Sequence, residues 1–142
     1  MALNADNKAH IQAIWPSVAA HADTYGGEAL FRMFSSNPQT KVYFPAFDFH
    51  EKSPQIQKHG KKIVDALTEA VSHMDNIEGA LDKLSDLHAF KLRVDPGNFS
   101  LLAHHILVVI ARHFPKKFDC ATHQALDKFL ARIESALTCK YR

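Results

Sequence analysis

Hydrophobic residues recur at spacings of three and four along most of the chain, a pattern typical of amphipathic α-helices. The first run consists of Ile11, Ile14, Trp15, Val18 and Ala22. The side chain of Asn4 or Asp6 can cap the N-terminus of this helix. Pro16 is expected to kink the helix or to end it early, because proline cannot donate a backbone hydrogen bond.

A second helical pattern follows two adjacent glycines, Gly26 and Gly27, and consists of Leu30, Met33 and Phe34. Adjacent glycines lower helix propensity. Two interpretations remain open at this point. Either another helix crosses closely over the glycines, or the glycines form a simple turn.

Three further helix starts are marked by a capping residue directly before a proline, since proline fits the first helical position. Asn37-Pro38 predicts a short helical turn. Ser53-Pro54 precedes a helix with an apolar face of Ile56, Gly60, Ile63, Val64, Leu67, Val71 and Met74. Asp95-Pro96 precedes a run that ends before Pro115 and contains Phe99, Leu102, Ala103, Ile106, Val109 and Ile110. Asp119 can cap a last helix with an apolar face of Leu126, Phe129, Leu130, Ile133 and Leu137.

The segment from Val42 to Phe49 does not follow a helical pattern. It carries four aromatic residues, interrupted by Pro45. A strand followed by a turn is one interpretation. The alternative is a connection whose aromatic rings pack against something large and flat. Because the rest of the chain has almost no strand signal, we expect an all-α fold of about seven helices with short connections.

Composition and charge narrow the class of protein. A chain of 142 residues with 46% hydrophobic and 23% charged residues suits a single domain over residues 1–142. The net charge of +2, from 17 basic and 15 acidic residues, is too small for a nucleic-acid-binding surface. There is no apolar run of membrane-span length and no secretory pattern, so we expect a cytosolic protein. Cys120 and Cys139 are expected to be free thiols in such a compartment.

His88 lies on the apolar face of the segment from Leu81 to Val94. On a helix, Leu81, Leu84 and His88 share one face, and Leu92 follows one turn later. A neutral imidazole in an apolar interior needs partners for both ring nitrogens. The simpler interpretation is a core histidine with ordinary hydrogen bonds. The other is a metal ligand, because imidazole is the commonest protein ligand of metals.

His59 stands beside the aliphatic face of the helix that follows Ser53. Its basic neighbours Lys58, Lys61 and Lys62 are also compatible with a surface position. If His59 and His88 face each other across a cavity, however, a planar iron porphyrin fits between them. His88 would bind the iron, and His59 would donate a hydrogen bond to a diatomic ligand on the opposite face. Covalent attachment is not expected, because the chain has no Cys-x-x-Cys-His motif.

Several segments together resemble a known family. YFPAFDF, KHGKK, LSDLHAFKLRVDPGNF, LDKFLARI and the terminal Lys-Tyr-Arg are similar to globins, specifically to alpha-type chains of vertebrate haemoglobins. The resemblance covers essentially the whole chain. It implies a globin fold around a pocket for non-covalent haem b, with His88 as proximal iron ligand and His59 as distal histidine. It also implies that the haem is contacted by Tyr43, Phe44, Phe47, Lys62, Ile63, Leu84, Leu87, Leu92, Val94, Asn98, Phe99, Leu102 and Leu137.

The resemblance further implies assembly with beta-type chains into an α2β2 tetramer. The residues that match the tight alpha–beta contact are Arg32, His104, Phe118, His123 and Asp127. Those that match the sliding contact are Lys41, Val42, Tyr43, Arg93, Asp95, Tyr141 and Arg142. In the family's low-affinity state, the terminal arginine pairs with charges on a neighbouring alpha chain, and Asp127 is present to receive Arg142.

This chain departs from the family's pattern at a few positions. Ile63 stands where valine is common, and its extra methyl group is expected to narrow the distal pocket. Ala46 stands where a histidine often lies near the haem propionates, so faster haem loss is a hypothesis. Gln39 and Val42 replace threonines that face the partner chain, which affects the expected size of cooperativity.

The implied function is reversible binding and transport of dioxygen in red blood cells, without enzymatic turnover. A haem peroxidase would favour a distal arginine, and none lies near His59 in the sequence. A dedicated dioxygenase or gas sensor would need a further domain. A monomeric storage globin would bind oxygen hyperbolically, and a cofactor-free helical module would show no Soret absorption band.

Overall fold

The computed structural model describes residues 2–92 and 95–140, with side chains of residues 90–92 also outside the description. In this part of the chain there are seven α-helices, one 3₁₀ helix and one π-helical segment, and no strand. The predicted all-α globin architecture is confirmed. None of the helices described is long and apolar enough to cross a membrane.

The first two helices correspond to the first two apolar patterns of the sequence. α1 (Ala5–Ala19) is capped by Asn4, whose side chain accepts a hydrogen bond from the backbone N–H of Asn7. α1 ends three residues after Pro16, as the proline predicted. α2 (Ala22–Ser36) starts before the two glycines, so the interpretation of Gly26-Gly27 as a turn is wrong.

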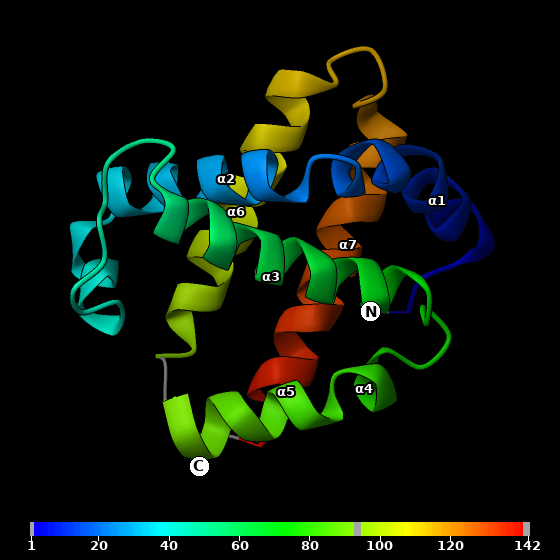
Figure 1. The fold of residues 1–142 in the computed structure, drawn as a ribbon. Coiled ribbons are helices and arrows are strands. Elements are labelled where there is room, and N and C mark those ends of the chain that lie inside the picture. Colours follow the sequence, from blue (N-terminus) through cyan, green and yellow to red (C-terminus); the bar gives the residue numbers. More distant parts are fainter. Residues whose placement is uncertain (1, 93–94, 141–142) are drawn as a thin grey trace.

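The glycines instead allow two helices to touch through their backbones. α2 crosses α3 (Pro54–Val71), and an added Cβ at Gly26 would lie 2.1 Å from the carbonyl oxygen of Gly60. An added Cβ at Gly60 would lie 2.2 Å from the backbone nitrogen of Gly27. Figure 1 shows this crossing at the upper part of the molecule. Because no side chain fits there, the crossing sets the separation of α2 and α3.

The aromatic segment is a connection and contains no strand. η1 (Pro38–Tyr43) begins at the proline as predicted, but the side chain of Asn37 makes no capping hydrogen bond. The side-chain cap is therefore absent, while the Asn37 backbone carbonyl accepts hydrogen bonds from the backbone N–H and hydroxyl of Thr40. The rings of Phe44 and Phe49 pack edge-on against Phe34 of α2, with centroids 5.1 and 4.9 Å away.

The next elements form the wall that carries His88. α4 (Ile77–Ala80) and α5 (Asp82–Asp86) are short, and the π-helical segment η2 (Leu87–Leu92) continues directly from α5. The sequence suggested one helix here, whereas the structure changes helix type at Leu87. A π-helical turn is wider than an α-helical turn and is common at functional sites. Leu81, Leu84 and His88 nevertheless face the same cavity, as the spacing predicted.

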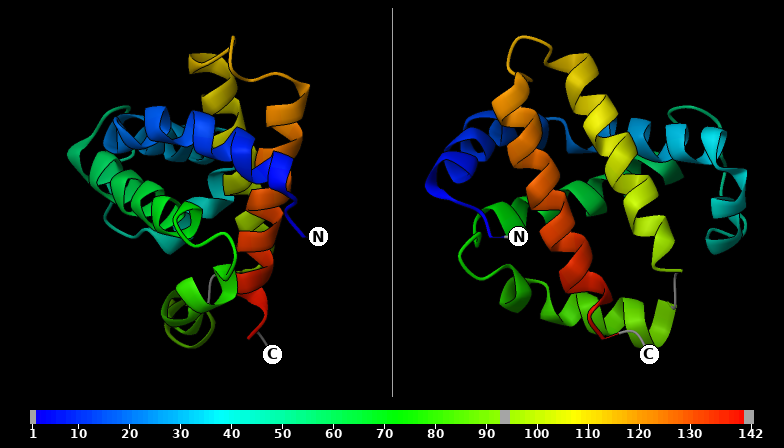
Figure 2. Two further views of the ribbon diagram at one scale, coloured as in Figure 1. Left: turned by 90° about the vertical axis from the view of Figure 1, so that its right-hand side faces the viewer. Right: turned by 180° about the vertical axis from the view of Figure 1, so that it is seen from behind.

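The last two helices run side by side in opposite directions, as Figure 2 shows from behind. α6 (Gly97–His113) ends before Pro115, and α7 (Cys120–Thr138) is capped by the Asp119 side chain, which accepts from the N–H of Thr122. Both features agree with the sequence prediction. The main core joins α1, α3, α6 and α7, with Trp15 and Phe129 in edge-on contact at its centre. The Trp15 indole N–H donates to the hydroxyl of Thr68, 2.8 Å away.

Candidate functional site

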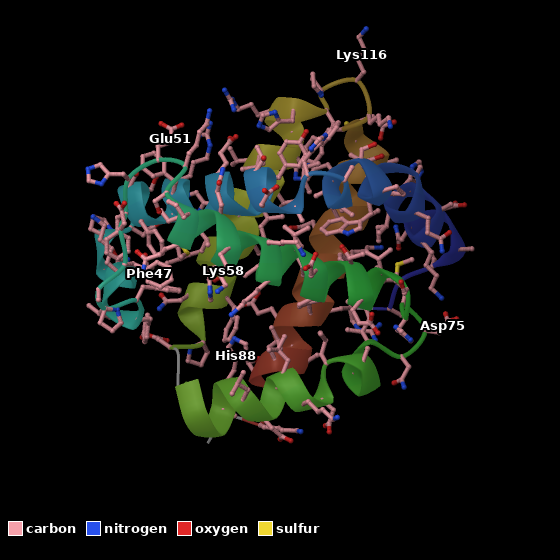
Figure 3. All side chains as sticks on the ribbon, in the orientation of Figure 1. Phe47, Glu51, Lys58, Asp75, His88 and Lys116 are labelled. Carbon is pink, nitrogen blue, oxygen red and sulfur yellow. The ribbon has the colours of Figure 1, made fainter. Side chains whose placement is uncertain are left out.

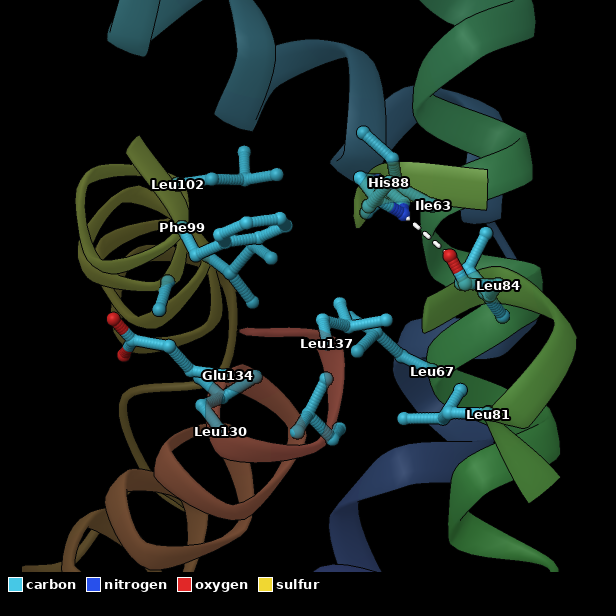
Figure 4. A pocket seen from close by; sticks show the side chains of 14 residues that line it. Ile63, Leu67, Leu81, Leu84, His88, Phe99, Leu102, Leu130, Glu134 and Leu137 are labelled. Atoms are coloured by element: carbon cyan, nitrogen blue, oxygen red, sulfur yellow. Dashed lines mark hydrogen bonds between the residues drawn. The ribbon is translucent and has the colours of Figure 1, made fainter. Parts of the chain in front are cut away.

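An apolar cavity of about 110 Å³ lies between α3, α5 with η2, α6 and α7. Its lining is aliphatic or aromatic apart from His88 and Glu134. Figure 4 shows His88 at one side of this cavity, opposite Phe99 and Leu102 of α6. The full lining is Ile63, Ala66, Leu67, Leu81, Leu84, His88, Phe99, Leu102, Ala103, Ile106, Leu130, Ile133, Glu134 and Leu137.

The imidazole of His88 is held in one orientation by its own helix. Its Nδ1 atom lies 2.8 Å from the backbone carbonyl oxygen of Leu84. A carbonyl can only accept a hydrogen bond, so Nδ1 carries the proton, and in the neutral ring Nε2 carries the lone pair. The ring of Phe99 lies 5.2 Å away, centroid to centroid. This is the tautomer and support that a metal-binding histidine requires.

His59 lies on α3 and is half-buried by the aromatic connection. The ring centroids of Phe44 and Phe47 are 5.1 and 6.0 Å from that of His59, both edge-on. Burial lowers the pKa of His59 below its ordinary value of 6.5, and the nearby charges of Lys62 and His88 lower it further. His59 is therefore neutral at physiological pH and keeps one ring N–H as a donor.

The other predicted haem-contacting residues fall into four groups. Five of them line the cavity together with His88: Ile63, Leu84, Phe99, Leu102 and Leu137. Phe44 and Phe47 pack against His59, while Tyr43 accepts a hydrogen bond from the backbone N–H of Asp95, 3.1 Å away. Lys62 and Leu87 are exposed and Asn98 is half-buried, and none of these three lines the cavity. The side chains of Leu92 and Val94 lie outside the described residues.

The inner part of the cavity was not assigned from the sequence. Its lining there includes Ala66, Leu67, Ala103, Ile106, Leu130, Ile133 and Glu134. Most of these positions continue the apolar faces of α3, α6 and α7, so their signal is the same as that of ordinary core residues. Hydrophobic spacing identifies a buried face, but it does not distinguish a packed face from one that borders a cavity.

The residues predicted for the tight contact lie mostly on α2, α6 and α7. The Arg32 guanidinium donates to Glu28 at 2.9 Å, and Arg112 and His113 contact the other oxygen of the same carboxylate at 3.0 and 2.7 Å. Burial would raise the pKa of Glu28, but hydrogen bonds with His113 and Arg32 bring it below its ordinary value. The remaining residues of this group are exposed or half-buried: His104, Phe118, His123 and Asp127.

The residues predicted for the sliding contact lie near η1 and the start of α6. Val42 is 72% exposed, which is unusual for so large an apolar side chain. Lys41 is exposed, and its ammonium lies 5.2 Å from the centroid of the Phe49 ring. Asp95 is exposed as well. Arg93, Tyr141 and Arg142 lie outside the described residues.

The donor set suits a prosthetic group better than a bare metal ion. Among the described residues, no cluster of three or more His, Cys, Asp or Glu side chains could hold a metal ion. One histidine of fixed tautomer, facing a largely apolar cavity, instead suits a metal whose other ligands come with a cofactor. A second histidine, His59, lies beside the rings of Phe44 and Phe47 on α3, the helix that contributes Ile63 to the lining. Figure 3 shows His88 pointing from η2 toward the interior of the molecule. The residues present therefore fit a haem.

An all-helical fold with an oriented histidine in an apolar pocket, and a second histidine among aromatic rings on α3, which also lines that pocket, is the architecture of a haem-binding globin. The sequence profile described as Globin matches residues 27–137. The chain is 69% identical to haemoglobin subunit alpha-1 of Xenopus borealis over 142 residues, which cover all of both chains. It is 70% identical to haemoglobin subunit alpha-2 of Telmatobius peruvianus over 138 residues, 96% of this chain and all of the relative. It is 61% identical to haemoglobin subunit alpha-C of Aquarana catesbeiana over the full length of both.

The chain belongs to the globin family. Within that family, these full-length identities make it an alpha-type chain of vertebrate haemoglobin. The expected oxygen-transport function of such a subunit is confirmed at this level.

Proposed function

We propose that this chain binds haem b through His88 and carries dioxygen reversibly as the alpha-type subunit of an α2β2 haemoglobin. The observation that supports this most is the His88 imidazole, held in one orientation by the Leu84 carbonyl and facing an apolar pocket. When bound, haem supplies a ferrous iron that binds dioxygen reversibly. The side chains around it hold the cofactor, exclude water and donate a hydrogen bond to the ligand.

His88 holds the cofactor on the proximal side. Its Nδ1–H donates to the Leu84 carbonyl, and this hydrogen bond increases the electron-donating power of Nε2. Leu84 and Phe99 keep water away from the ring, since both line the cavity. A dry pocket matters because water and protons favour oxidation of ferrous iron, which would end reversible binding.

His59 acts on the distal side as a hydrogen-bond donor. Its neutral ring keeps one N–H, and Phe44 and Phe47 restrict how the ring can turn. This N–H would stabilise a haem ligand that carries partial negative charge, which favours dioxygen over carbon monoxide. Ile63 borders the same cavity and limits the space for entry. Lys62 would meet a haem propionate at the surface.

Ala46 is expected to weaken haem retention, because alanine offers no side-chain contact to a haem propionate. It replaces a histidine that often lies near the propionates in the family, and its backbone has φ 65°. This left-handed conformation is unfavourable for alanine and is adopted more often by histidine. An Ala46→His variant is therefore expected to fold readily and to transfer haem more slowly to an apo-acceptor protein.

The chain would work in red blood cells with a beta-type partner. The tight contact would be formed around Arg32, His104, Phe118, His123 and Asp127, and the sliding contact around Lys41, Val42, Tyr43, Arg93, Asp95, Tyr141 and Arg142. Rotation of subunits at such a contact is the established way in which haemoglobins change oxygen affinity. The exposed Val42 supports a contact in this region, because burial of an exposed apolar side chain in an interface lowers the free energy.

The test is an oxygen equilibrium curve on the protein assembled with its beta-type partner, with the visible spectrum recorded along the titration. A Soret band and a Hill coefficient well above one support haem, the partner and two quaternary states together. A hyperbolic curve with a normal oxy spectrum would keep the haem assignment and contradict cooperative assembly. A protein without a Soret band would contradict the proposal entirely.

A further inference from the structure

The C-terminal end of α7 is tied to α5 by one lysine. Lys140 Nζ lies 2.7 Å from Asp82 Oδ1, 2.6 Å from Asp86 Oδ1 and 3.4 Å from the backbone carbonyl oxygen of Asp82. An ammonium group has three donors, so these acceptors can use all of them. The partners are 58 and 54 residues away in the sequence, so the contact joins two separate elements. Figure 2 shows the end of α7 beside α5.

The two aspartates span the whole of α5, the helix that leads into His88. Leu84 lies between them, and its carbonyl is the acceptor that orients the His88 ring. Asp82 and Asp86 are four residues apart, where like charges on a helix repel each other. Lys140 removes this repulsion, and it does so at the turn that orients the proximal histidine.

Besides Lys140, α5 is held by Ser85, Leu84 and the preceding Leu81. A five-residue helix has little stability of its own, so its position depends on tertiary contacts. Ser85, only 2% exposed, faces α7 with its hydroxyl 4.0 Å from the Cys139 sulfur, directly next to Lys140. Leu81, just before α5, and Leu84 face the cavity, which α7 also lines through Leu137. The tie of Lys140 to both aspartates therefore completes the attachment of α5 to α7.

We infer that Lys140 is a positioning residue for the proximal histidine: by holding Asp82 and Asp86, it fixes the turn of α5 whose carbonyl orients His88. This inference rests on the proposed role of His88 as the haem ligand. Loss of Lys140 lets α5 shift relative to α7. This shift would tilt the His88 imidazole and weaken its bond to the haem iron. The global stability changes little, because partly exposed ion pairs contribute little to folding.

The experiment compares Lys140→Met with the unmodified chain, both assembled with the beta-type partner. The first readout is the iron–histidine stretching band in the resonance Raman spectrum of the deoxy form. The second is the rate of haem transfer to an apo-acceptor. The third does not involve haem, and it is the amide hydrogen exchange of the peptide that covers residues 82–88. Lys140→Met is expected to shift or broaden the band, to speed haem loss by about two- to fivefold and to raise amide exchange, while the melting temperature stays nearly unchanged.

Two further variants make the test specific. Lys140→Arg keeps the charge and reaches both aspartates, so it is expected to restore all three readouts. Lys61→Met is the matched control, since Lys61 pairs with Asp65 at 2.7 Å within α3 and is also a partly exposed ion pair. It is expected to leave the band unchanged. If Lys140→Met does not fold, Asp82→Asn removes one of the two partners and gives the same test with a smaller effect.

The outcomes separate this inference from the proposed function. A Raman band and haem-loss rate that do not change in Lys140→Met would overturn the positioning role and leave His88 as the ligand. The same change in Lys61→Met would also overturn it, because the effect would then come from any lost surface charge pair. An unmodified chain without an iron–histidine band would instead contradict the proposed function itself.

Discussion

His59 is carried by the 18-residue helix α3, whereas His88 lies in a six-residue π-helical segment that follows the five-residue helix α5. α3 is fixed by a backbone-to-backbone crossing with α2 and by buried apolar residues such as Ile56 and Val64. α5 is attached mainly through Leu81, Leu84, Ser85 and the Lys140 ion pairs. The distal wall is thus set by dense packing and the proximal wall by a few separate contacts.

This difference gives the two walls different tasks. A densely packed helix holds a donor such as His59 in place, because close packing restricts movement of the helix. An element with few buried contacts can change position at low cost, and moving elements are generally drawn from this class. In the proposed α2β2 assembly, quaternary change would therefore reach the haem more easily through the α5 side than through α3.

The largest effect is expected where α2 and α3 cross. Gly60→Ala places a Cβ against the Gly27 nitrogen, so the two helices must separate, and the loss of unfolding free energy should be about 3 kcal/mol. Urea unfolding measures it. Gly97→Ala is the matched control: its added Cβ would have Asp95 Oδ1 as nearest neighbour at 3.6 Å, so a change of no more than about 1 kcal/mol is expected. Equal losses in both variants would show that the crossing does not hold α3.

A smaller effect is expected from the donor on the distal wall. His59→Leu removes the N–H and should speed dioxygen dissociation about tenfold, with little change for carbon monoxide. His59→Gln keeps an N–H donor and should lie between the two. Stopped-flow ligand displacement measures both rates. Dissociation of dioxygen at the original rate in His59→Leu would rule out the proposed hydrogen bond.

The Glu28 cluster on α2 should make stability depend on pH. The folded-state pKa of Glu28 is below its ordinary value of 4.5, so its contribution is complete above that value and is lost as the pH falls through the folded-state pKa. Glu28→Gln is expected to cost about 1 kcal/mol at neutral pH, and the difference should shrink at acidic pH. Unfolding curves at several pH values measure it. A cost that stays constant with pH would contradict this role, and Asp65→Asn, at an exposed ion pair, provides the control.

The smallest effect concerns the size of the distal pocket. Ile63→Val removes one methylene group from the cavity lining and should speed carbon monoxide association by no more than about fourfold, the equivalent of about 0.8 kcal/mol. Ile56→Val removes the same group from the buried face of α3 that packs against α2, and should leave association unchanged. Flash photolysis measures both. An unchanged rate in Ile63→Val would show that this side chain does not limit entry.

Much of the fold follows from local sequence signals. Asn4, Ser53 and Asp119 cap their helices as predicted, because a capping bond depends on residues only three apart. The role of Gly26 and Gly27 stayed open at the level of sequence, since only the facing Gly60 explains them. The change to a π-helix at Leu87 could not be read from the sequence, because the apolar spacing of Leu81, Leu84 and His88 fits a continuous α-helix equally well.

The sequence predicted some residues of the site and missed others for the same reason. His88 and Ile63 line the cavity as expected from their spacing, but the inner residues Ala103 and Ile133 have the pattern of ordinary core positions. The hydrogen bond from His88 to Leu84 and the tie of Lys140 to α5 depend on geometry that spacing does not contain.

Among the ten histidines of the chain, His88 is the one proposed to bind the haem iron. The decisive measurement is the resonance Raman spectrum of the deoxy form of His88→Gly, with and without added imidazole. His105→Gly is the matched control, because His105 is also buried, with Nδ1 2.7 Å from the Leu101 carbonyl, but does not line the cavity. The iron–histidine band should disappear in His88→Gly, return as an iron–imidazole band when imidazole is added, and persist in His105→Gly. A band that persists in His88→Gly without imidazole would contradict the assignment of His88 as the haem ligand.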